Sequence, residues 1–151
     1  MTSDILIFNV LKKSDDEFIN KCNLKFIDKS VPAQEDDTIY IANMDLQLRQ
    51  ELYESTEYTA LVNIYVKTKD TDYLSGSRFL RTVIKHIKYA LRNDDDCKSR
   101  KIIFRNTSYE YGSGYTLKGM HLVVQLLEHE SHNIDEEHYS CVTLDTDDLI
   151  I

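Results

Sequence analysis

The stretch from Tyr58 to Leu127 constrains the fold most, because each of its segments has a clear hydrophobic period. Apolar and polar residues alternate from Tyr58 to Lys69, which predicts a strand with one buried face. The buried face is expected to carry Tyr58, Ala60, Val62, Ile64 and Val66. Residues 75–92 instead repeat at steps of three and four, and residues 101–128 return to alternation. We therefore expect the order strand, helix, strand, tight loop, strand.

The helix expected over residues 75–92 is amphipathic. Ser75 or Ser77 is the expected N-cap, because a serine hydroxyl can accept a hydrogen bond from a backbone N–H of the first turn. Acidic side chains are unfavourable at a helix C-terminus, so Asn93–Asp96 is expected to form a solvated loop. The apolar face comprises Phe79, Leu80, Val83, Ile84, Ile87, Ala90 and Leu91.

A hairpin is expected near the end of this stretch. Its strands are residues 101–109 and 115–128, and the loop between them contains Gly112 and Gly114. Glycine permits the positive φ angles that a tight turn requires. The second strand should bury Met120, Leu122, Val124 and Leu126.

The N-terminal third of the sequence is less regular. Residues 2–13 are expected to form a helix capped by the Thr2 or Ser3 hydroxyl, with Asp4 in its first turn. Residues 38–42 form a β-rich run that predicts a strand. Residues 44–56 fit strand alternation in part and helix spacing in part, so their structure stays open. A set of apolar residues after the first helix either extends it or forms a second short helix: Phe18, Ile19, Cys22 and Phe26.

These elements predict one domain over residues 1–128, followed by an acidic tail or arm over 129–151. The expected class is α+β, with a mixed, mostly antiparallel sheet flanked by the N-terminal helix and the central amphipathic helix. The N-terminus lacks the pattern of a secretory signal, and the cysteines are odd in number and widely spaced. A cytoplasmic protein with free thiols is therefore expected. The formal net charge of −8 argues against a general affinity for nucleic acid.

The central helix carries the most distinct charge feature of the sequence. Five cations recur at steps of three and four residues, which places them along one stripe opposite the apolar face. A solvated outer face is the simplest interpretation. The functional alternative is contact with an acidic surface on a neighbouring subunit or partner, and a third is contact with nucleic acid. The stripe consists of Arg78, Arg81, Lys85, Lys88 and Arg92.

A short histidine cluster near the C-terminus is the one metal-like pattern. His129 and His132 are three residues apart, with His138 nearby. The zinc-protease pattern H-E-x-x-H needs one more residue between its histidines, so solvated polarity or adventitious metal binding is the simpler interpretation. The sequence also lacks a phosphate-binding loop and a G-x-S-x-G nucleophile motif. We therefore expect no enzyme activity, no metal site and no cofactor.

Aromatic usage is skewed toward tyrosine, with ten tyrosines and no tryptophan. Tyr109, Tyr111 and Tyr115 cluster around the predicted hairpin tip. Tyrosine is enriched in interfaces because it combines a large contact area with a polar end. These three residues join the cationic stripe as candidates for a subunit interface.

The order of elements resembles that of the tail terminator, or tail-completion, proteins of long-tailed bacteriophages. The segments that carry the resemblance are YTALVNIYVKTKD, SGSRFLRTVIKHIKYALRN, KIIFRNTSYEY and YTLKGMHLVVQLLEHE. The resemblance covers residues 1–128 and rests on element order and local texture. It implies a hexameric ring that caps the tail tube and joins it to the head, with the helix at 75–92 and the hairpin contributing ring contacts. It also implies assembly in the host cytoplasm, a final place at the head-proximal end of the tail, and a tube protein and a connector protein as partners.

Three functions follow as expectations. The first is a structural virion protein that ends tail polymerisation through protein contacts. The second is a small acidic regulatory or inhibitor protein that occupies a basic partner. The third is a metal-dependent hydrolase that would use His129, His132 and His138.

Overall fold

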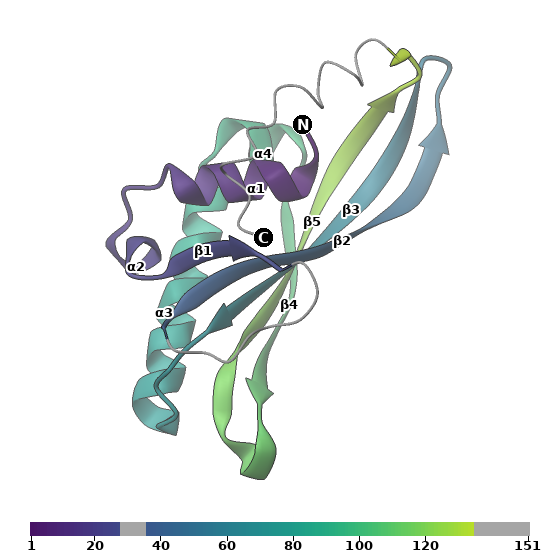
Figure 1. Ribbon diagram of the computed structural model, residues 1–151. Coiled ribbons are helices and arrows are strands. Elements are labelled where there is room, and N and C mark those ends of the chain that lie inside the picture. Colours follow the sequence, from purple (N-terminus) through teal and green to yellow (C-terminus); the bar gives the residue numbers. More distant parts are fainter. Residues whose placement is uncertain (28–35, 135–151) are drawn as a thin grey trace.

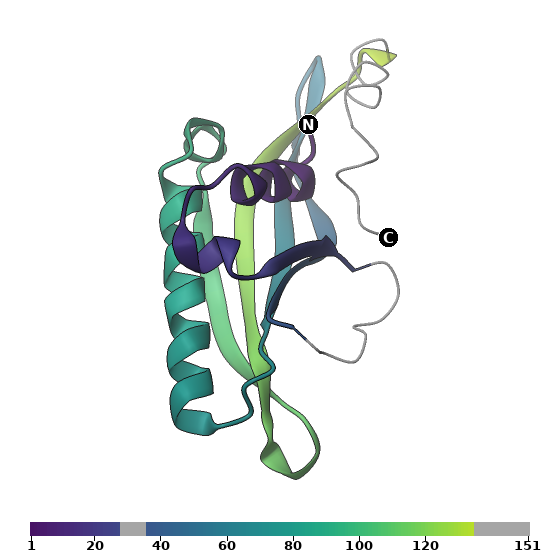
Figure 2. The ribbon, with the colours of Figure 1, turned by 60° about the vertical axis from the view of Figure 1, so that its left-hand side comes forward.

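The computed structural model describes residues 1–27 and 36–134, which form a five-stranded mixed sheet with helices packed on one face (Figures 1 and 2). The strand order is β1-β2-β3-β5-β4, with β1 parallel to β2 and every other pairing antiparallel. This architecture confirms the expected α+β class. The elements are α1 (Ser3–Lys12), α2 (Glu17–Asn20), β1 (Asn23–Phe26), β2 (Thr38–Glu51), β3 (Ser55–Lys67), α3 (Tyr73–Arg92), α4 (Asp95–Ser99), β4 (Ile103–Tyr111), η1 (Ser113–Tyr115) and β5 (Leu117–Ser131).

One hydrophobic core lies between the sheet and the helices α1 and α3. The alternation predicted for β3 and β5 is confirmed, since Val62, Ile64, Leu122 and Val124 are all fully buried. Helix α1 adds Ile7, Phe8 and Leu11, and helix α3 adds Leu80, Val83, Ile84, Ile87 and Leu91. Burial of these apolar side chains is the main driving force for the fold.

The predicted N-terminal helix is confirmed, but its predicted cap is not. Thr2 occupies the N-cap position, and its hydroxyl makes no capping hydrogen bond. Ser3 contacts the rest of the fold instead: its backbone N–H donates to Glu128, and its hydroxyl accepts from Arg100 at 3.0 Å. These long-range partners compete with a local cap and tie the start of α1 to the end of β5.

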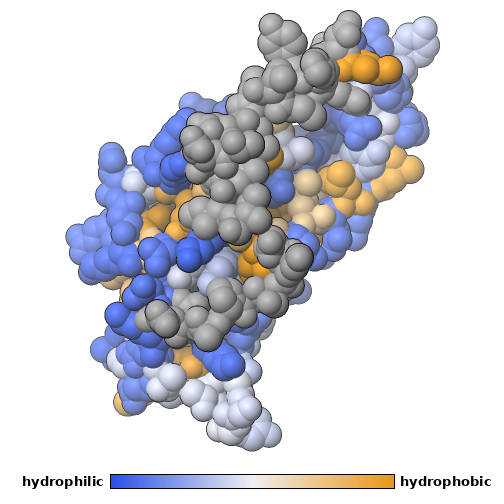
Figure 3. Space-filling model, viewed as in Figure 1, coloured by the Kyte–Doolittle hydropathy of each residue, from blue (hydrophilic) through white to orange (hydrophobic). Residues whose placement is uncertain are grey.

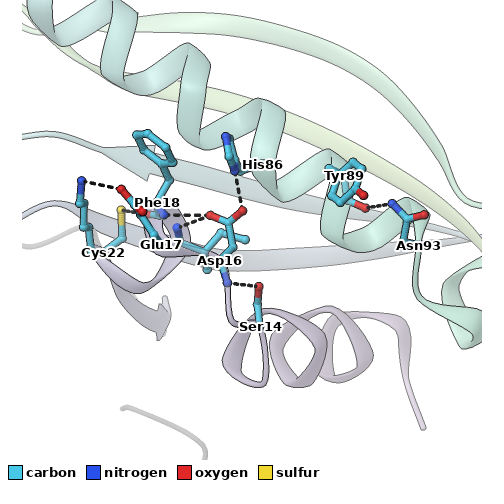
Figure 4. Close-up of polar contacts among 10 residues, drawn as sticks. Ser14, Asp16, Glu17, Phe18, Cys22, His86, Tyr89 and Asn93 are labelled. Carbon is cyan, nitrogen blue, oxygen red and sulfur yellow. Dashed lines mark hydrogen bonds and ion pairs between the residues drawn. The ribbon is translucent and has the colours of Figure 1, made fainter.

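A second short helix, α2, follows α1, so the alternative of one extended helix is wrong. Asp16 caps α2 by accepting hydrogen bonds from the backbone N–H groups of Phe18 and Ile19. The same carboxylate bonds to Nδ1 of His86 on α3 (Figure 4). Phe26 lies in β1 rather than in a helix.

Strand β2 is much longer than the predicted strand at residues 38–42. It continues to Glu51, and a short turn then leads into β3 at Ser55. Residues 44–56, whose structure the sequence left open, are therefore strand, turn and strand. Register shifts after Ile41 and after Leu48 explain the broken alternation, because each bulge changes which face the next side chain occupies.

Helix α3 starts two residues before the predicted start. Its N-cap is Asp72, whose carboxylate accepts a hydrogen bond from the Ser75 backbone N–H at 3.0 Å. Neither Ser75 nor Ser77 is the cap, so that prediction is wrong. A carboxylate at this position adds a favourable interaction with the helix dipole to the capping hydrogen bond.

The acidic run after α3 is also not the solvated loop that we expected. Asp94 caps α4 by accepting from the Cys97 backbone N–H at 3.0 Å, and Asp95 and Asp96 occupy the first turn of that helix. Acids that would be unfavourable at the end of α3 are thus favourable at the start of α4.

The hairpin of β4 and β5 is confirmed, with a turn that uses one glycine in the left-handed region. Gly114 has φ 69°, whereas Gly112 has an extended backbone. Tyr115 also has a positive φ, of 60°. Strand β4 starts two residues later and ends two residues later than the strand predicted over residues 101–109.

The far ends of β2, β3 and β5 project beyond the helices as a three-stranded arm (Figure 1). We call β2 from Met44, β3 up to Val62 and β5 from Val124 the β arm. Strand β5 runs to Ser131, so the boundary predicted after Glu128 falls inside this strand. The rest of the predicted acidic tail, from residue 135, lies outside the described residues.

Candidate functional site

A groove between α3 and β4 brings together the residues that sequence analysis selected most strongly. We call it the basic groove, and its volume is about 380 Å³. One wall is the polar side of α3, the other is β4, and Met120 of β5 lies among the lining residues. The lining residues are Arg81, Ile84, Lys85, Lys88, Thr107, Ser108, Tyr109 and Met120.

The helix places its cations in the groove because of their spacing. Leu80 and Ile84 anchor α3 in the core. Steps of four and three residues then place Arg81, Lys85 and Lys88 on neighbouring turns of one side of the helix. The groove therefore has a row of positive charges along one wall.

Aromatic side chains of β4 hold several of these cations. Arg81 donates a hydrogen bond from Nε to the Tyr109 hydroxyl, and its guanidinium carbon lies 5.5 Å from the Tyr109 ring centroid. Further along α3, Lys88 and Arg92 lie 6.0 and 4.8 Å from the Phe104 ring centroid. Such contacts fix the direction of a cation without neutralising its charge.

The next feature of the groove is the pairing of its positive charges within the described residues. Within residues 1–27 and 36–134, none of the five stripe cations forms an ion pair with a carboxylate. Thr107 and Ser108 add hydroxyl donors on the opposite wall. The groove can therefore bind carboxylate or phosphate groups through ammonium, guanidinium and hydroxyl donors.

The other predicted interface residues lie around the groove rather than in it. Arg78 is exposed one turn before Arg81, and Arg92 lies over Phe104 at the other end of α3. Tyr111 and Tyr115 are at the hairpin tip, where Tyr115 is 89% exposed. Tyr109, in contrast, connects the two regions, because its ring packs against both Tyr73 and Tyr111.

Apart from Tyr109, sequence analysis missed the β4 wall of the groove. Thr107 and Ser108 follow a register shift between Phe104 and Thr107, so simple alternation does not assign their faces. Phe104 was part of a predicted strand, and nothing in the sequence pointed to its position under Lys88 and Arg92.

The two described histidines of the metal-like pattern have protein partners. His129 bonds to Glu57 at 2.9 Å, and His132 bonds to the Thr56 hydroxyl at 3.0 Å. In the part of the chain that the structure describes, no group of three or more histidine, cysteine or acidic side chains is placed to hold a metal ion. The third residue of the predicted cluster, His138, lies outside the described residues.

Glu57, the partner of His129, also interacts with Gln50 and Arg49. Burial opposes ionisation, but hydrogen bonds from His129 and Gln50 and the charge of Arg49 lower the pKa of the Glu57 carboxyl. Arg49 contributes through an ion pair of 3.1 Å between its Nε and Glu57. The histidines thus belong to an ionic network that links β2, β3 and β5 in the β arm.

The two cysteines that the structure describes are both free thiols. Cys97 is fully buried. Burial, reinforced by Asp94, raises its pKa to about 12, and burial together with Asp37 raises the pKa of Cys22 to about 12. Neither thiol is therefore a thiolate near neutral pH, which is the form that nucleophilic or metal-binding cysteines need.

Comparison with known proteins adds no assignment. A scan against models of known protein families finds no match, and a search of curated proteins finds no similar sequence. Among the described helices, none combines the length and the apolar character that crossing a membrane requires.

Proposed function

We propose that this chain is a structural assembly protein that acts like the phage tail terminators it resembles. In this proposal, copies of the chain form a ring on the end of a tail tube, stop its polymerisation and present a new surface to the head connector. The subunits assemble in the host cytoplasm and remain in the virion at the head-proximal end of the tail. The protein uses contacts between surfaces and needs no cofactor.

The observation that carries the proposal is the basic groove. Its row of cations is oriented by aromatic side chains and lacks acidic partners among the described residues. The protein has a formal net charge of −8, and the stripe places five of its 18 lysines and arginines along one helix. This stripe is complementary to the acidic regions of the chain itself. The basic groove can therefore bind acidic protein surfaces, including those of further copies of the chain.

The position of exposed acids supports head-to-tail contacts between copies. Asp95 and Asp96 are exposed on α4, beyond the C-terminal end of α3. The groove opens along α3 itself, so acids and cations occupy different surfaces of one subunit. Complementary surfaces at separate places on a subunit give heterologous contacts, and these close into a ring when the rotation between neighbours allows it.

Cosedimentation with tail tubes tests the proposal. The full chain is mixed with tubes assembled from the tail-tube protein of the same virus, and bound protein is measured over a salt series. The unchanged chain should bind at tube ends, and Arg81→Glu/Lys85→Glu should reduce binding by at least about tenfold because two cations of the groove become acids. The matched control is Lys98→Glu, which changes an exposed cation of α4 outside the groove.

The outcomes are distinct. Binding that is lost with the groove variant and kept with Lys98→Glu supports assembly through the groove. A chain that fails to bind tube ends, or that binds equally well with both variants, contradicts it. Binding of the unchanged chain to a basic protein instead of to tubes would favour the inhibitor function.

A further inference from the structure

Strand β2 has an open edge along the β arm. Strand β1 pairs only with Thr38–Ile41, so from Met44 to Glu51 no strand lies on the outer side of β2 among the described residues. Natural proteins usually protect such an edge, because its unpaired N–H and C=O groups can bind another strand. The regular part of this edge runs from Met44 to Leu48, because the register shift between Leu48 and Gln50 interrupts the strand beyond it.

The backbone groups that this edge presents can be identified. The Ile41 carbonyl accepts a hydrogen bond from the Ile27 N–H, so the backbone groups of Ile41 face β1. Ile41 and Ile64 are therefore a non-hydrogen-bonded pair of β2 and β3, and the backbone groups of Ile64 face β5. The residues of β3 that alternate with Ile64 do the same. Their partners on β2 therefore turn their N–H and C=O groups outward, and these partners are Met44, Leu46 and Leu48.

The side chains of the edge are apolar on one face and charged on the other. Leu46 and Leu48 are 44% and 63% exposed and lie on the face that continues the core. Asp45 and Gln47 lie on the opposite face, and Arg49, at the register shift between Leu48 and Gln50, reaches Glu57 on that face. Figure 3 shows apolar surface along the projecting arm.

This pattern is complementary to itself in one antiparallel register. When Gln47 lies opposite Gln47 of a second copy, Leu46 lies opposite Leu48 and Asp45 lies opposite Arg49. The leucine pairs are then the hydrogen-bonded pairs, which matches the outward backbone groups of both residues. Each pair occurs twice by symmetry, which gives two leucine contacts and two opposite-charge contacts.

We propose that the β2 edge binds the same edge of a second copy, antiparallel and centred on Gln47, and so joins two β arms into one six-stranded sheet. The pairing is isologous, whereas the ring contacts proposed above are heterologous. It therefore goes beyond the proposed function, and it uses none of the residues of the basic groove. A different edge, such as β4, does not offer the same alternation of leucines and opposite charges.

Disulfide trapping tests the register. Gln47 occupies a non-hydrogen-bonded pair on the symmetry axis, where the two Cα atoms are about 4.5 Å apart, close enough for a disulfide. Gln47→Cys in the full chain should therefore form a covalent dimer under mild oxidation. Tyr53→Cys is the matched control, because this residue is 97% exposed at the arm tip and lies away from the axis. Trapping at residue 47 that is no faster than at residue 53 overturns the proposal.

A charge swap tests the same register without a cross-link. Asp45→Arg places like charges opposite each other and should raise the dimer dissociation constant by roughly tenfold in sedimentation equilibrium. The double variant Asp45→Arg/Arg49→Asp restores opposite charges across the axis but loses the ion pair between Arg49 and Glu57. It should therefore bind more tightly than Asp45→Arg without reaching the affinity of the unchanged chain. A chain that stays monomeric, or a double variant no tighter than the single one, contradicts the pairing. Circular dichroism of each variant checks that it is folded.

Failure of this test and failure of the tail-tube test are distinguishable. The edge variants leave Arg81 and Lys85 in place, and the groove variant leaves Asp45 and Arg49 in place. Loss of edge pairing with normal tube binding would therefore reject only the dimer, and the reverse result would reject only the groove.

Discussion

At the scale of single residues, Asp16 shows how one carboxylate can connect two helices, α2 and α3. It caps α2 through the backbone N–H groups of Phe18 and Ile19, and it bonds to His86 on α3 (Figure 4). Burial opposes ionisation, but the hydrogen bond from His86 and those from the α2 backbone lower the pKa of this carboxyl below its usual 3.8. The charged form is therefore the one that stabilises the fold.

Asp16→Ala should lower the free energy of unfolding by about 1–2 kcal/mol near neutral pH, because a cap and a hydrogen bond between helices are lost together. A depressed folded-state pKa gives stability that is present above the unfolded value of 3.8 and is lost as pH falls through the folded value. The difference between the variant and the unchanged chain should therefore shrink in acid. Urea unfolding over a pH series measures it.

Asp15→Ala is the control for this prediction, since Asp15 is exposed and adjacent in sequence. It should change the free energy of unfolding by less than about 0.5 kcal/mol. An Asp16→Ala effect that is equally small, or that grows as pH falls, would contradict the role assigned to this carboxylate.

At the scale of elements, the boundaries of α3 show where sequence patterns succeed and fail. Its apolar spacing identified the helix and its buried face, because a period of 3.6 residues over 20 residues is hard to mistake. The cap was missed because Asp72, Ser75 and Ser77 are all good capping residues. Only the turn that precedes the helix determines which one adopts the N-cap conformation.

Asp72→Ala should therefore destabilise the protein by about 1 kcal/mol, because it removes the bond to the Ser75 backbone N–H. Ser77→Ala should cost less than about 0.5 kcal/mol, since the Ser77 hydroxyl bonds only to the Leu74 carbonyl within the helix. Thermal unfolding of the two variants compares the costs. A larger loss for Ser77→Ala would restore the cap that the sequence suggested.

The short elements were the hardest to predict. Helices α2 and α4 are too short for a hydrophobic period, and both depend on aspartate caps whose partners are specific to the fold.

Strand β2 was recognised only up to Ala42, because its bulges interrupt the alternation and its exposed half lacks a buried face. Periodicity detects burial, so an element that leaves the core loses its signal.

At the scale of the whole molecule, the sheet places a conventional core at one end and the β arm at the other (Figure 1). The sequence indicated the cationic stripe of the candidate site from spacing alone. The facing wall required the strand order, because β4 is an edge strand that lies next to α3 only after β3 and β5 have paired. Among the described strands, the same order leaves β2 without a partner on its outer side beyond Ile41, which no local pattern could indicate.

The two surfaces proposed for assembly, both formed by described residues, have different chemistry. The basic groove uses charge and aromatic support, whereas the β2 edge uses backbone hydrogen bonds and paired leucines. The proposed ring on a tube end uses the first, and the proposed symmetric contact between two copies uses the second. The account as a whole holds that the protein works by covering and joining surfaces.

The most direct test of that claim is the length of tail tubes that polymerise in the presence of the protein. Tube protein is assembled with and without the full chain, and tube lengths and ends are measured in electron micrographs. The account predicts ring-shaped caps at tube ends and arrested growth, with Arg81→Glu/Lys85→Glu allowing growth to continue. Tubes that grow to the same lengths with bare ends at every concentration of the chain would contradict it.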